Sequence, residues 1–160
     1  MTAGFSRRGF VKAGTAAGAF LLGWRGGRVV AASSAARLND WLAIGSDGAV
    51  TVRVNCVEMG QGAQTGMAQI LADELEADWE RVRVEMAPIA PPFLTRRGHY
   101  MTGGSGSIEF HVGKMRAMGA AWRDMLVRAA ASRWGVDPAA CRAERCTVVD
   151  TGSGRRLDYG

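Results

Sequence analysis

Two glycine-rich segments, each followed directly by a helical pattern, constrain the fold of this chain more than any other feature. The first is Glu58-Met59-Gly60-Gln61-Gly62, and the second is Thr102-Gly103-Gly104-Ser105-Gly106-Ser107. The first segment follows residues 50–57, in which apolar and polar side chains alternate as in a strand. We therefore expect strands and helices to be interleaved, with both glycine segments as loops that lead into helices.

Hydrophobic periodicity predicts the remaining elements. In chain order they are a hairpin with strands 41–44 and 50–54, a helix over 64–78, a strand over 81–86, a helix over 108–134, and short strands over 146–149 and 156–159. Asp47-Gly48 supplies the tight turn of the hairpin, Thr65 is expected to cap the first helix, and Gly135 is expected to end the second. The predicted fold class is α+β: a small mixed sheet with two packed helices.

Sulfur-containing side chains are predicted to be structural. The methionines at helical spacing are expected in the core rather than in a metal-thioether site; they are Met67, Met115, Met118 and Met125. Cys56 lies in a strand-like run and is expected to be a small buried hydrophobe. Cys141 and Cys146 lack the companion ligands of a zinc site, and a local disulfide between them is left open.

The net charge of +5 is confined to the N-terminus. Residues 1–36 hold five basic side chains and no acidic one; they are Arg7, Arg8, Lys12, Arg25 and Arg28. Of the 20 basic residues, 15 therefore remain in residues 37–160, where they balance all 15 acidic ones. A neutral body of this kind argues against nucleic acid as a partner, because such binding depends on an excess of basic side chains.

Residues 1–36 are predicted to be a signal peptide. Ser6-Arg7-Arg8-Gly9-Phe10-Val11-Lys12 resembles the twin-arginine export motif. The apolar stretch from Ala13 to Trp24 would rise about 18 Å as a helix, short of a ~30 Å bilayer core. Small residues over 30–36 offer cleavage sites. The chain is thus expected to be exported to the periplasm, and to be membrane-associated if the signal is retained; the alternative is a chance basic start.

The two glycine segments are the candidate binding elements. Gly60 and Gly62 have no Cβ, so a ligand can approach their backbone closely, and the amide of Gln61 can orient a polar ligand without adding charge. In the second segment, Gly103, Gly104, Ser105 and Ser107 offer N–H groups and hydroxyls at a helix start, which suit a phosphate or a pterin edge. The alternative is purely structural, with the glycines as turn formers and the serines as helix caps.

Other chemically active groups form no recognisable catalytic set. His99 and His111 are expected on the surface, and Arg96-Arg97 is either a solvated pair or a contact for an anionic cofactor tail. Glu58 is either an acceptor that supports the first loop or an ordinary carboxylate at a strand end. The spacing required for a Walker motif or a Rossmann fingerprint is missing, which argues against a cytosolic nucleotide-binding domain.

The order of the motifs is more specific than any one of them. After the export motif come Trp41-Leu42-x-Ile44-x-x-Asp47-Gly48-x-Val50-Thr51-Val52, Glu58-Met59-Gly60-Gln61-Gly62, Glu74-Leu75-x-Ala77-Asp78-Trp79-x-x-Val82-Arg83-Val84, Ala87-Pro88 and Thr102-Gly103-Gly104-Ser105-x-Ser107-Ile108. This order resembles the molybdopterin-binding large subunit of the xanthine dehydrogenase/aldehyde oxidase family. It is most similar to the exported branch typified by isoquinoline 1-oxidoreductase beta subunits, over essentially the whole chain.

The resemblance implies a molybdenum hydroxylase that oxidises aldehydes or N-heterocycles with oxygen from water. Its cofactor would be molybdopterin with molybdenum, in the cytosine dinucleotide form. Electrons would leave through iron–sulfur clusters on a small partner subunit and then through a c-type cytochrome, and the twin-arginine translocase would export the protein. By the same resemblance, Gly60-Gln61-Gly62 would approach the pterin or the metal's ligands, and Gly103, Gly104, Ser105 and Ser107 would hold the pterin or its phosphates.

The chain also departs from this family. Its members run to several hundred residues, and the glutamate that acts as their general base, in a Gly-Val-Gly-Glu-type segment near the far end, has no counterpart here. We therefore expect residues 37–160 to be the N-terminal part of an incomplete molybdopterin-binding domain. It would have no catalytic residue, no activity by itself, and uncovered apolar surface on the helices and at the chain end. The alternative is a small exported, non-catalytic binding module on the same scaffold.

Overall fold

The computed structural model describes residues 35–37, 39–95 and 97–160. The predicted signal peptide therefore lies outside the described residues, apart from Ala35 and Ala36, and so does Arg96. Among the helices of the described part, none is long and apolar enough to cross a membrane.

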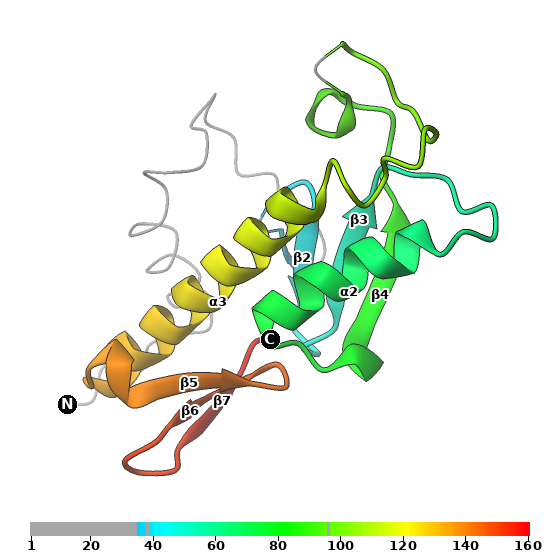
Figure 1. Cartoon of the computed structure of the whole chain (residues 1–160). Coiled ribbons are helices and arrows are strands. Elements are labelled where there is room, and N and C mark those ends of the chain that lie inside the picture. The colour runs from blue at the N-terminus through cyan, green and yellow to red at the C-terminus, as the bar shows by residue number, and fades with distance from the viewer. Residues whose placement is uncertain (1–34, 38, 96) are drawn as a thin grey trace.

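The larger sheet has four strands in the order β1-β2-β3-β4. They are β1 (Ala35–Arg37), β2 (Leu42–Gly45), β3 (Val50–Val54) and β4 (Val82–Met86). The first three are antiparallel neighbours, whereas β4 runs parallel to β3 with Val52 opposite Val84. Parallel neighbours need a crossover connection, and helix α2 (Ala63–Leu75) supplies it across one face of the sheet (Figure 1).

A second, smaller sheet follows the long helix α3 (Val112–Trp134). Its antiparallel strands are β5 (Cys141–Glu144), β6 (Thr147–Asp150) and β7 (Arg156–Asp158), and α3 packs against both this sheet and α2 (Figure 1). Three single 3₁₀ turns complete the described elements: η1 (Trp79–Arg81), η2 (Pro91–Phe93) and η3 (Pro138–Ala140). The α+β class with two packed helices is confirmed, but the strands form two sheets instead of one.

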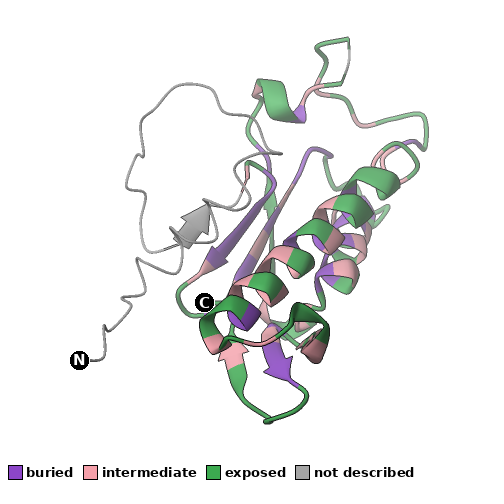
Figure 2. Ribbon diagram, turned by 90° about the vertical axis from the view of Figure 1, so that its left-hand side faces the viewer, coloured by how far each residue is buried: buried purple, intermediate pink, exposed green. Residues whose placement is uncertain are grey.

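The core lies between the four-stranded sheet and the two helices, where the buried faces meet (Figure 2). Val50, Val52 and Val54 alternate with partly exposed residues along β3, so one face of this strand is buried. Met67 and Met115 are fully buried, and the other two methionines predicted for the core, Met118 and Met125, pack against it. The predicted structural role of the methionines is therefore confirmed.

Helices α2 and α3 come into close backbone contact at Gly119. A Cβ added at this residue would lie 2.5 Å from the carbonyl oxygen of Leu71 and 3.1 Å from the amide nitrogen of Leu75. Both neighbours are backbone atoms of α2, which cannot move aside as a side chain can. Glycine at this position therefore sets the distance between the two helices.

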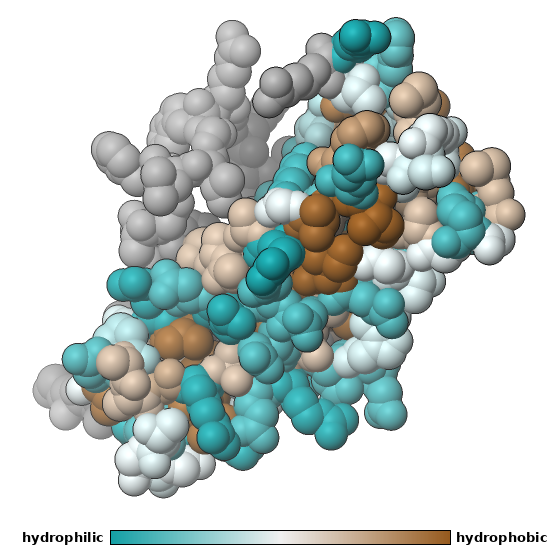
Figure 3. Space-filling model, in the orientation of Figure 1, coloured by the Kyte–Doolittle hydropathy of each residue, from teal (hydrophilic) through white to brown (hydrophobic). Residues whose placement is uncertain are grey.

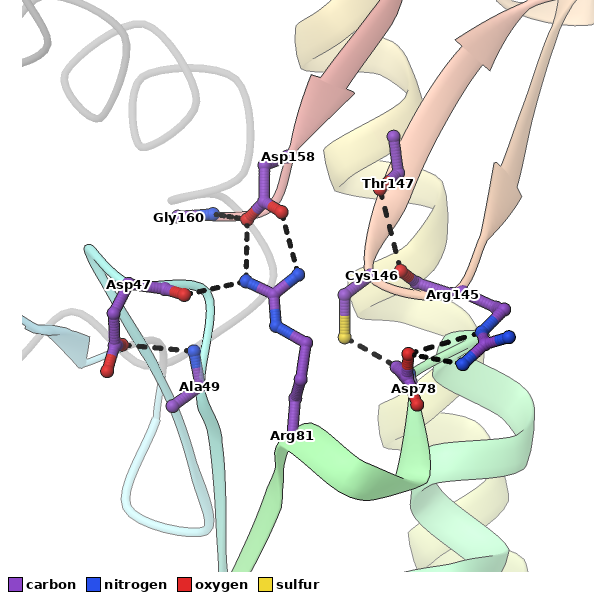
Figure 4. A network of polar contacts seen from close by, with 9 residues as sticks. All are labelled: Asp47, Ala49, Asp78, Arg81, Arg145, Cys146, Thr147, Asp158 and Gly160. Carbon is purple, nitrogen blue, oxygen red and sulfur yellow. Dashed lines mark hydrogen bonds and ion pairs between the residues drawn. The ribbon is translucent and has the colours of Figure 1, made fainter.

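A polar network joins the two sheets (Figure 4). Arg81, just before β4, pairs with both carboxylate oxygens of Asp158 in β7 at 2.7 and 3.1 Å and also donates to the carbonyl of Asp47 at 2.6 Å. Beside it, Arg145 donates two hydrogen bonds to Asp78. The bidentate geometry fixes direction as well as distance, so the network orients the second sheet against the turn of the β2–β3 hairpin.

The three cysteines are free thiols. Cys56 is buried, as predicted, and burial raises the pKa of its thiol, so it is a poor nucleophile. The disulfide left open by the sequence is not formed. Cys141 begins β5 and Cys146 follows its end, so the extended backbone of β5 separates the two residues along the strand by roughly 13 Å.

Candidate functional site

The two glycine segments, predicted separately, lie side by side in the structure. We call residues 58–62 the first glycine loop and residues 102–107 the second. The Thr102 hydroxyl at the start of the second loop accepts a hydrogen bond from the backbone N–H of Val57 at 2.8 Å, immediately before the first. Both loops therefore lie beyond the carboxyl end of β3, which is where open α/β sheets place their ligands.

The carboxylate of Glu58 caps helix α2 from within the first loop. Its oxygens accept hydrogen bonds from the backbone N–H groups of Gly60 at 2.8 Å, Gly62 at 2.9 Å and Gln64 at 3.3 Å. These bonds, that of Gly62 foremost, lower the pKa of Glu58. The prediction of Thr65 as the cap is wrong, because α2 begins at Ala63 and the Glu58 carboxylate accepts hydrogen bonds from Gly62 and Gln64 at its start.

This capping decides what kind of ligand the first loop accepts. A helix N-terminus attracts anions, but here the chain's own carboxylate occupies it, and its negative charge repels a second anion. The side chain of Gln61 is folded back as well: its Nε2 donates to the Val57 carbonyl at 2.8 Å, and its Oε1 accepts from Met59 N at 2.6 Å. One amide hydrogen and one lone pair remain for a neutral polar group.

Backbone conformation accounts for the two glycines of the first loop. Gly60 has φ 94° and Gly62 has φ 73°, a region that side-chain-bearing residues rarely adopt. No atom lies within 4 Å of a Cβ built on either residue. The turn-forming interpretation therefore suffices for these two positions, and it also leaves their outer surface open to a ligand.

The second loop contains one residue with a strained backbone, Ser105, and one position, Gly103, at which nothing in the described chain requires glycine. Gly104 and Ser105 have φ values of 62° and 55°, as in a type I′ turn, and the N–H of Gly106 closes this turn onto the Gly103 carbonyl at 3.3 Å. The left-handed conformation of Ser105 costs roughly 1–2 kcal/mol. Gly103, in contrast, has no positive φ, and a Cβ there would meet nothing within 4 Å.

The serines of the second loop do not cap α3. The helix begins at Val112, four residues later than predicted, because residues 107–111 first form turns, and its N-cap His111 makes no side-chain cap bond. Within the described residues, the hydroxyls of Ser105 and Ser107 and the N–H of Ser105 have no hydrogen-bond partner. The capping interpretation is thus wrong for Ser105 and Ser107.

The surface position predicted for His111 is also wrong. This side chain is half-buried, with Nδ1 2.9 Å from the Ser107 carbonyl oxygen and Nε2 3.2 Å from Nδ2 of Asn55. Sequence reasoning missed Asn55, although a polar residue that ends a run of buried valines is a usable signal. His99 is exposed, as predicted, and so is Arg97.

The surroundings of the loops are apolar and open. Several exposed large side chains lie around them; they are Val57, Met59, Met101, Phe110 and Val112. Hydrophobic surface gathers near the start of α3, where it lies against α2 (Figure 3). No cluster of three or more potential metal-ligating His, Cys, Asp or Glu side chains exists among the described residues. The groups that the described part of the two loops offers to a ligand are therefore backbone and hydroxyl groups.

Comparison with known proteins identifies the relatives of this chain. The family model for the molybdopterin cofactor-binding domain matches residues 4–159. The chain is 35% identical over 123 residues to a membrane-bound aldehyde dehydrogenase [pyrroloquinoline-quinone] of Gluconacetobacter polyoxogenes, and 34% identical over 125 residues to the isoquinoline 1-oxidoreductase subunit beta of Brevundimonas diminuta. These matches cover 75% and 76% of this chain, but only 15% and 16% of the relatives.

Proposed function

Since the chain belongs to the molybdopterin cofactor-binding domain family, we propose that its two glycine loops form part of the site that binds a molybdopterin cofactor in an oxidoreductase. The observation that carries this proposal is the hydrogen bond from Val57 to Thr102, which unites the two loops at the end of β3. The family is enzymatic: one relative is named as an aldehyde dehydrogenase and the other as a subunit of an oxidoreductase.

The residues of the two loops fit different parts of such a cofactor. In the second loop, Gly103 leaves room that nothing in the described chain fills, and Ser105 and Ser107 offer unpartnered donors. We assign the pterin edge or the phosphates to this loop. The first loop suits a neutral polar group at Gln61, because the Glu58 carboxylate disfavours phosphate there.

When bound, the cofactor supplies the two-electron redox chemistry, and the described residues hold and orient it. We further propose the cytosine dinucleotide form of the cofactor and aldehydes or N-heterocycles as substrates, with water as the oxygen source. The partners proposed are a small subunit with iron–sulfur clusters, a c-type cytochrome and the twin-arginine translocase, with the periplasm as the location. In this proposal residues 37–160 are the N-terminal part of a larger domain and are inactive alone.

One relative's name points to a different cofactor. The aldehyde dehydrogenase is named for pyrroloquinoline quinone, whereas the family model is named for molybdopterin. We favour molybdopterin because the family model covers residues 4–159 of this chain, and because backbone N–H groups and serine hydroxyls suit a pterin edge or a phosphate.

The test is to isolate the native protein from its host and to measure its intact mass, its molybdenum content and its organic cofactor. We expect about one molybdenum per chain, a fluorescent pterin after oxidation, and a mass several times the 17.0 kDa of this sequence. Quinone without molybdenum would overturn the cofactor assignment. A mass near 17.0 kDa with neither cofactor would favour the alternative, a non-catalytic exported module.

A further inference from the structure

A buried pair of polar side chains connects β3 to the second glycine loop. Asn55 is only 5% exposed, directly after the last residue of β3, and its Nδ2 donates to the carbonyl of Phe93 at 2.8 Å. The same Nδ2 lies 3.2 Å from Nε2 of His111, whose Nδ1 lies 2.9 Å from the carbonyl oxygen of Ser107. The chain of contacts therefore runs from the sheet through the imidazole to the loop backbone.

The direction of every hydrogen bond in this chain is determined. The carbonyls of Phe93 and Ser107 can only accept, so the amide of Asn55 must present its NH₂ group to Phe93, and His111 must carry its proton on Nδ1. The Nε2 atom of a neutral imidazole is then an acceptor for the second hydrogen of Asn55. The side-chain oxygen of Asn55 is the one buried side-chain polar atom without a partner in the described part of the chain.

This arrangement of hydrogen bonds favours the neutral imidazole of His111 over the protonated form. A proton on Nε2 would face the NH₂ group of Asn55, and Asn55 cannot turn its oxygen toward the ring without losing its bond to Phe93. Burial lowers the pKa of His111, and the nearby Lys114 ammonium on α3 acts in the same direction. Trp41 lies beside the imidazole, with ring centroids 6.1 Å apart, and limits its movement.

The second glycine loop is thus anchored at both ends to the same strand end. At one end, the Thr102 hydroxyl accepts a hydrogen bond from Val57. At the other end, Ser107 is connected through His111 to Asn55, which lies two residues before Val57. Between these anchors, the backbone groups of residues 103–106 make two hydrogen bonds in the described chain: the turn from Gly106 to Gly103, and a bond from the N–H of Phe110 to the Gly106 carbonyl. The two anchors therefore decide where the open glycines and the serine hydroxyls lie.

We propose that Asn55 and His111 are positioning residues that set the second glycine loop for its ligand, with His111 acting as a neutral donor to the Ser107 carbonyl. The consequence for cofactor retention rests on the proposed function, but the anchoring of the loop does not. An unpartnered buried oxygen on Asn55 is costly, and this role accounts for an asparagine in an otherwise apolar position.

A series of His111 variants in the full natural polypeptide tests the proposal. His111→Asn places an amide donor near the position of Nδ1, His111→Gln places an amide near Nε2, and His111→Phe keeps the ring volume without either. We expect amide hydrogen exchange at Gly106 and Phe110, whose N–H groups bond to the carbonyls of Gly103 and Gly106, to accelerate about three- to tenfold in the Gln and Phe variants. The Asn variant keeps a donor to Ser107 but loses the contact with Asn55, so its exchange should accelerate less. Molybdenum content should follow the same order. His99→Phe, at an exposed histidine, is the matched control.

Imidazole ¹⁵N chemical shifts of the wild-type protein provide a readout that needs no variant. They should show the Nδ1–H tautomer at neutral pH. An Nε2–H tautomer, or equal exchange rates and molybdenum contents across the series, would overturn the positioning role. Wild-type protein without molybdenum would contradict the proposed function instead, and the exchange series would still decide whether His111 anchors the loop.

Discussion

Gly103 is the residue whose identity depends most directly on a ligand. Neither a positive φ nor a neighbouring atom requires glycine there, so Gly103→Ala should leave the stability of the folded chain unchanged. If the cofactor lies against this backbone, the added methyl group should weaken its retention roughly tenfold, for a strain of about 1.4 kcal/mol. Molybdenum content after dialysis, with the melting temperature measured in parallel, checks this expectation.

Gly113→Ala provides the matched control for this prediction. Gly113 lies in the first turn of α3, and a Cβ there also meets nothing within 4 Å. This variant should retain molybdenum as the wild type does. Equal retention in the Gly103 and Gly113 variants would remove the second loop from the cofactor site.

Glu58 makes the start of α2 sensitive to acid. Its folded-state pKa is lowered, so its stabilising effect is complete above its unfolded pKa of about 4.3 and is lost as the pH falls through the folded-state value. Amide exchange of residues 62–65, corrected for the intrinsic rate, should therefore lose protection below about pH 4.

The Glu58→Gln variant should show this loss of protection already at neutral pH, because it removes the charge that faces the helix N-terminus. Glu80→Gln, at an exposed carboxylate in η1, should leave the exchange of residues 62–65 unchanged. Unaltered protection in the Glu58 variant would show that the hydrogen bonds to Gly60 and Gly62 contribute little to the start of the helix.

At the scale of elements, the packing of α3 on α2 depends on Gly119. Gly119→Ala places a methyl group 2.5 Å from the Leu71 carbonyl, and we expect it to destabilise the fold by about 1–3 kcal/mol because the two helices must separate. Gly113→Ala, in the open part of the same helix, should instead be neutral or stabilising by up to about 1 kcal/mol. Urea denaturation of both variants measures the difference, and equal midpoints would contradict the close approach.

Local pattern was sufficient to predict most elements, and backbone hydrogen bonding explains the strand β5 and the start of α3, which it missed. The hairpin, α2 and β4 have clear periodicity, and their predicted bounds differ by only a few residues from β2, β3, α2 and β4. The strand β5 contains Arg142 and Glu144 and shows no alternation; it is extended because its backbone pairs with β6, with Cys141 opposite Asp150. The later start of α3 arises in a similar way, from turns that hold the second loop.

The residue types of the candidate site could be predicted from the sequence, but the contacts between these residues could not. The glycines, Gln61 and the serines were identifiable because their chemistry is unusual at loop positions. The contacts that make them one site join residues 45 positions apart, Val57 and Thr102, and 56 positions apart, Asn55 and His111. A periodic pattern carries no information about such pairs, so the half-buried imidazole of His111 was mistaken for a surface residue.

For the molecule as a whole, the exposed apolar surface lies mostly outside the two helices on which the sequence predicted it. The methionines of the helices belong to the core, whereas the large exposed apolar side chains of the described chain lie on the loops, at Trp79 in η1, at Val112 where α3 begins, and on β4, where Val84 is 36% and Met86 is 53% exposed. Val84 lies opposite Val52 of β3, and Met86 lies opposite Val54. Residues opposite one another point to the same face of a sheet, so both side chains lie on the face that the helices cover, where they are nevertheless exposed. The outer edge of β4 pairs with no strand of the described chain.

An edge strand with exposed apolar side chains favours association between chains. We therefore expect the 160-residue chain, expressed by itself, to self-associate at micromolar concentration, and Met86→Lys to reduce that association at least severalfold, because a charged side chain at the edge must be desolvated on pairing. Sedimentation velocity of the wild-type chain and of the Met86→Lys variant measures this difference in association.

The control is Arg83→Lys, which keeps the charge on the opposite face of the same strand and should associate like the wild type. If Met86→Lys also did so, association would have to arise from the apolar residues around the glycine loops, and a Met59→Lys variant would then be the one to lower it.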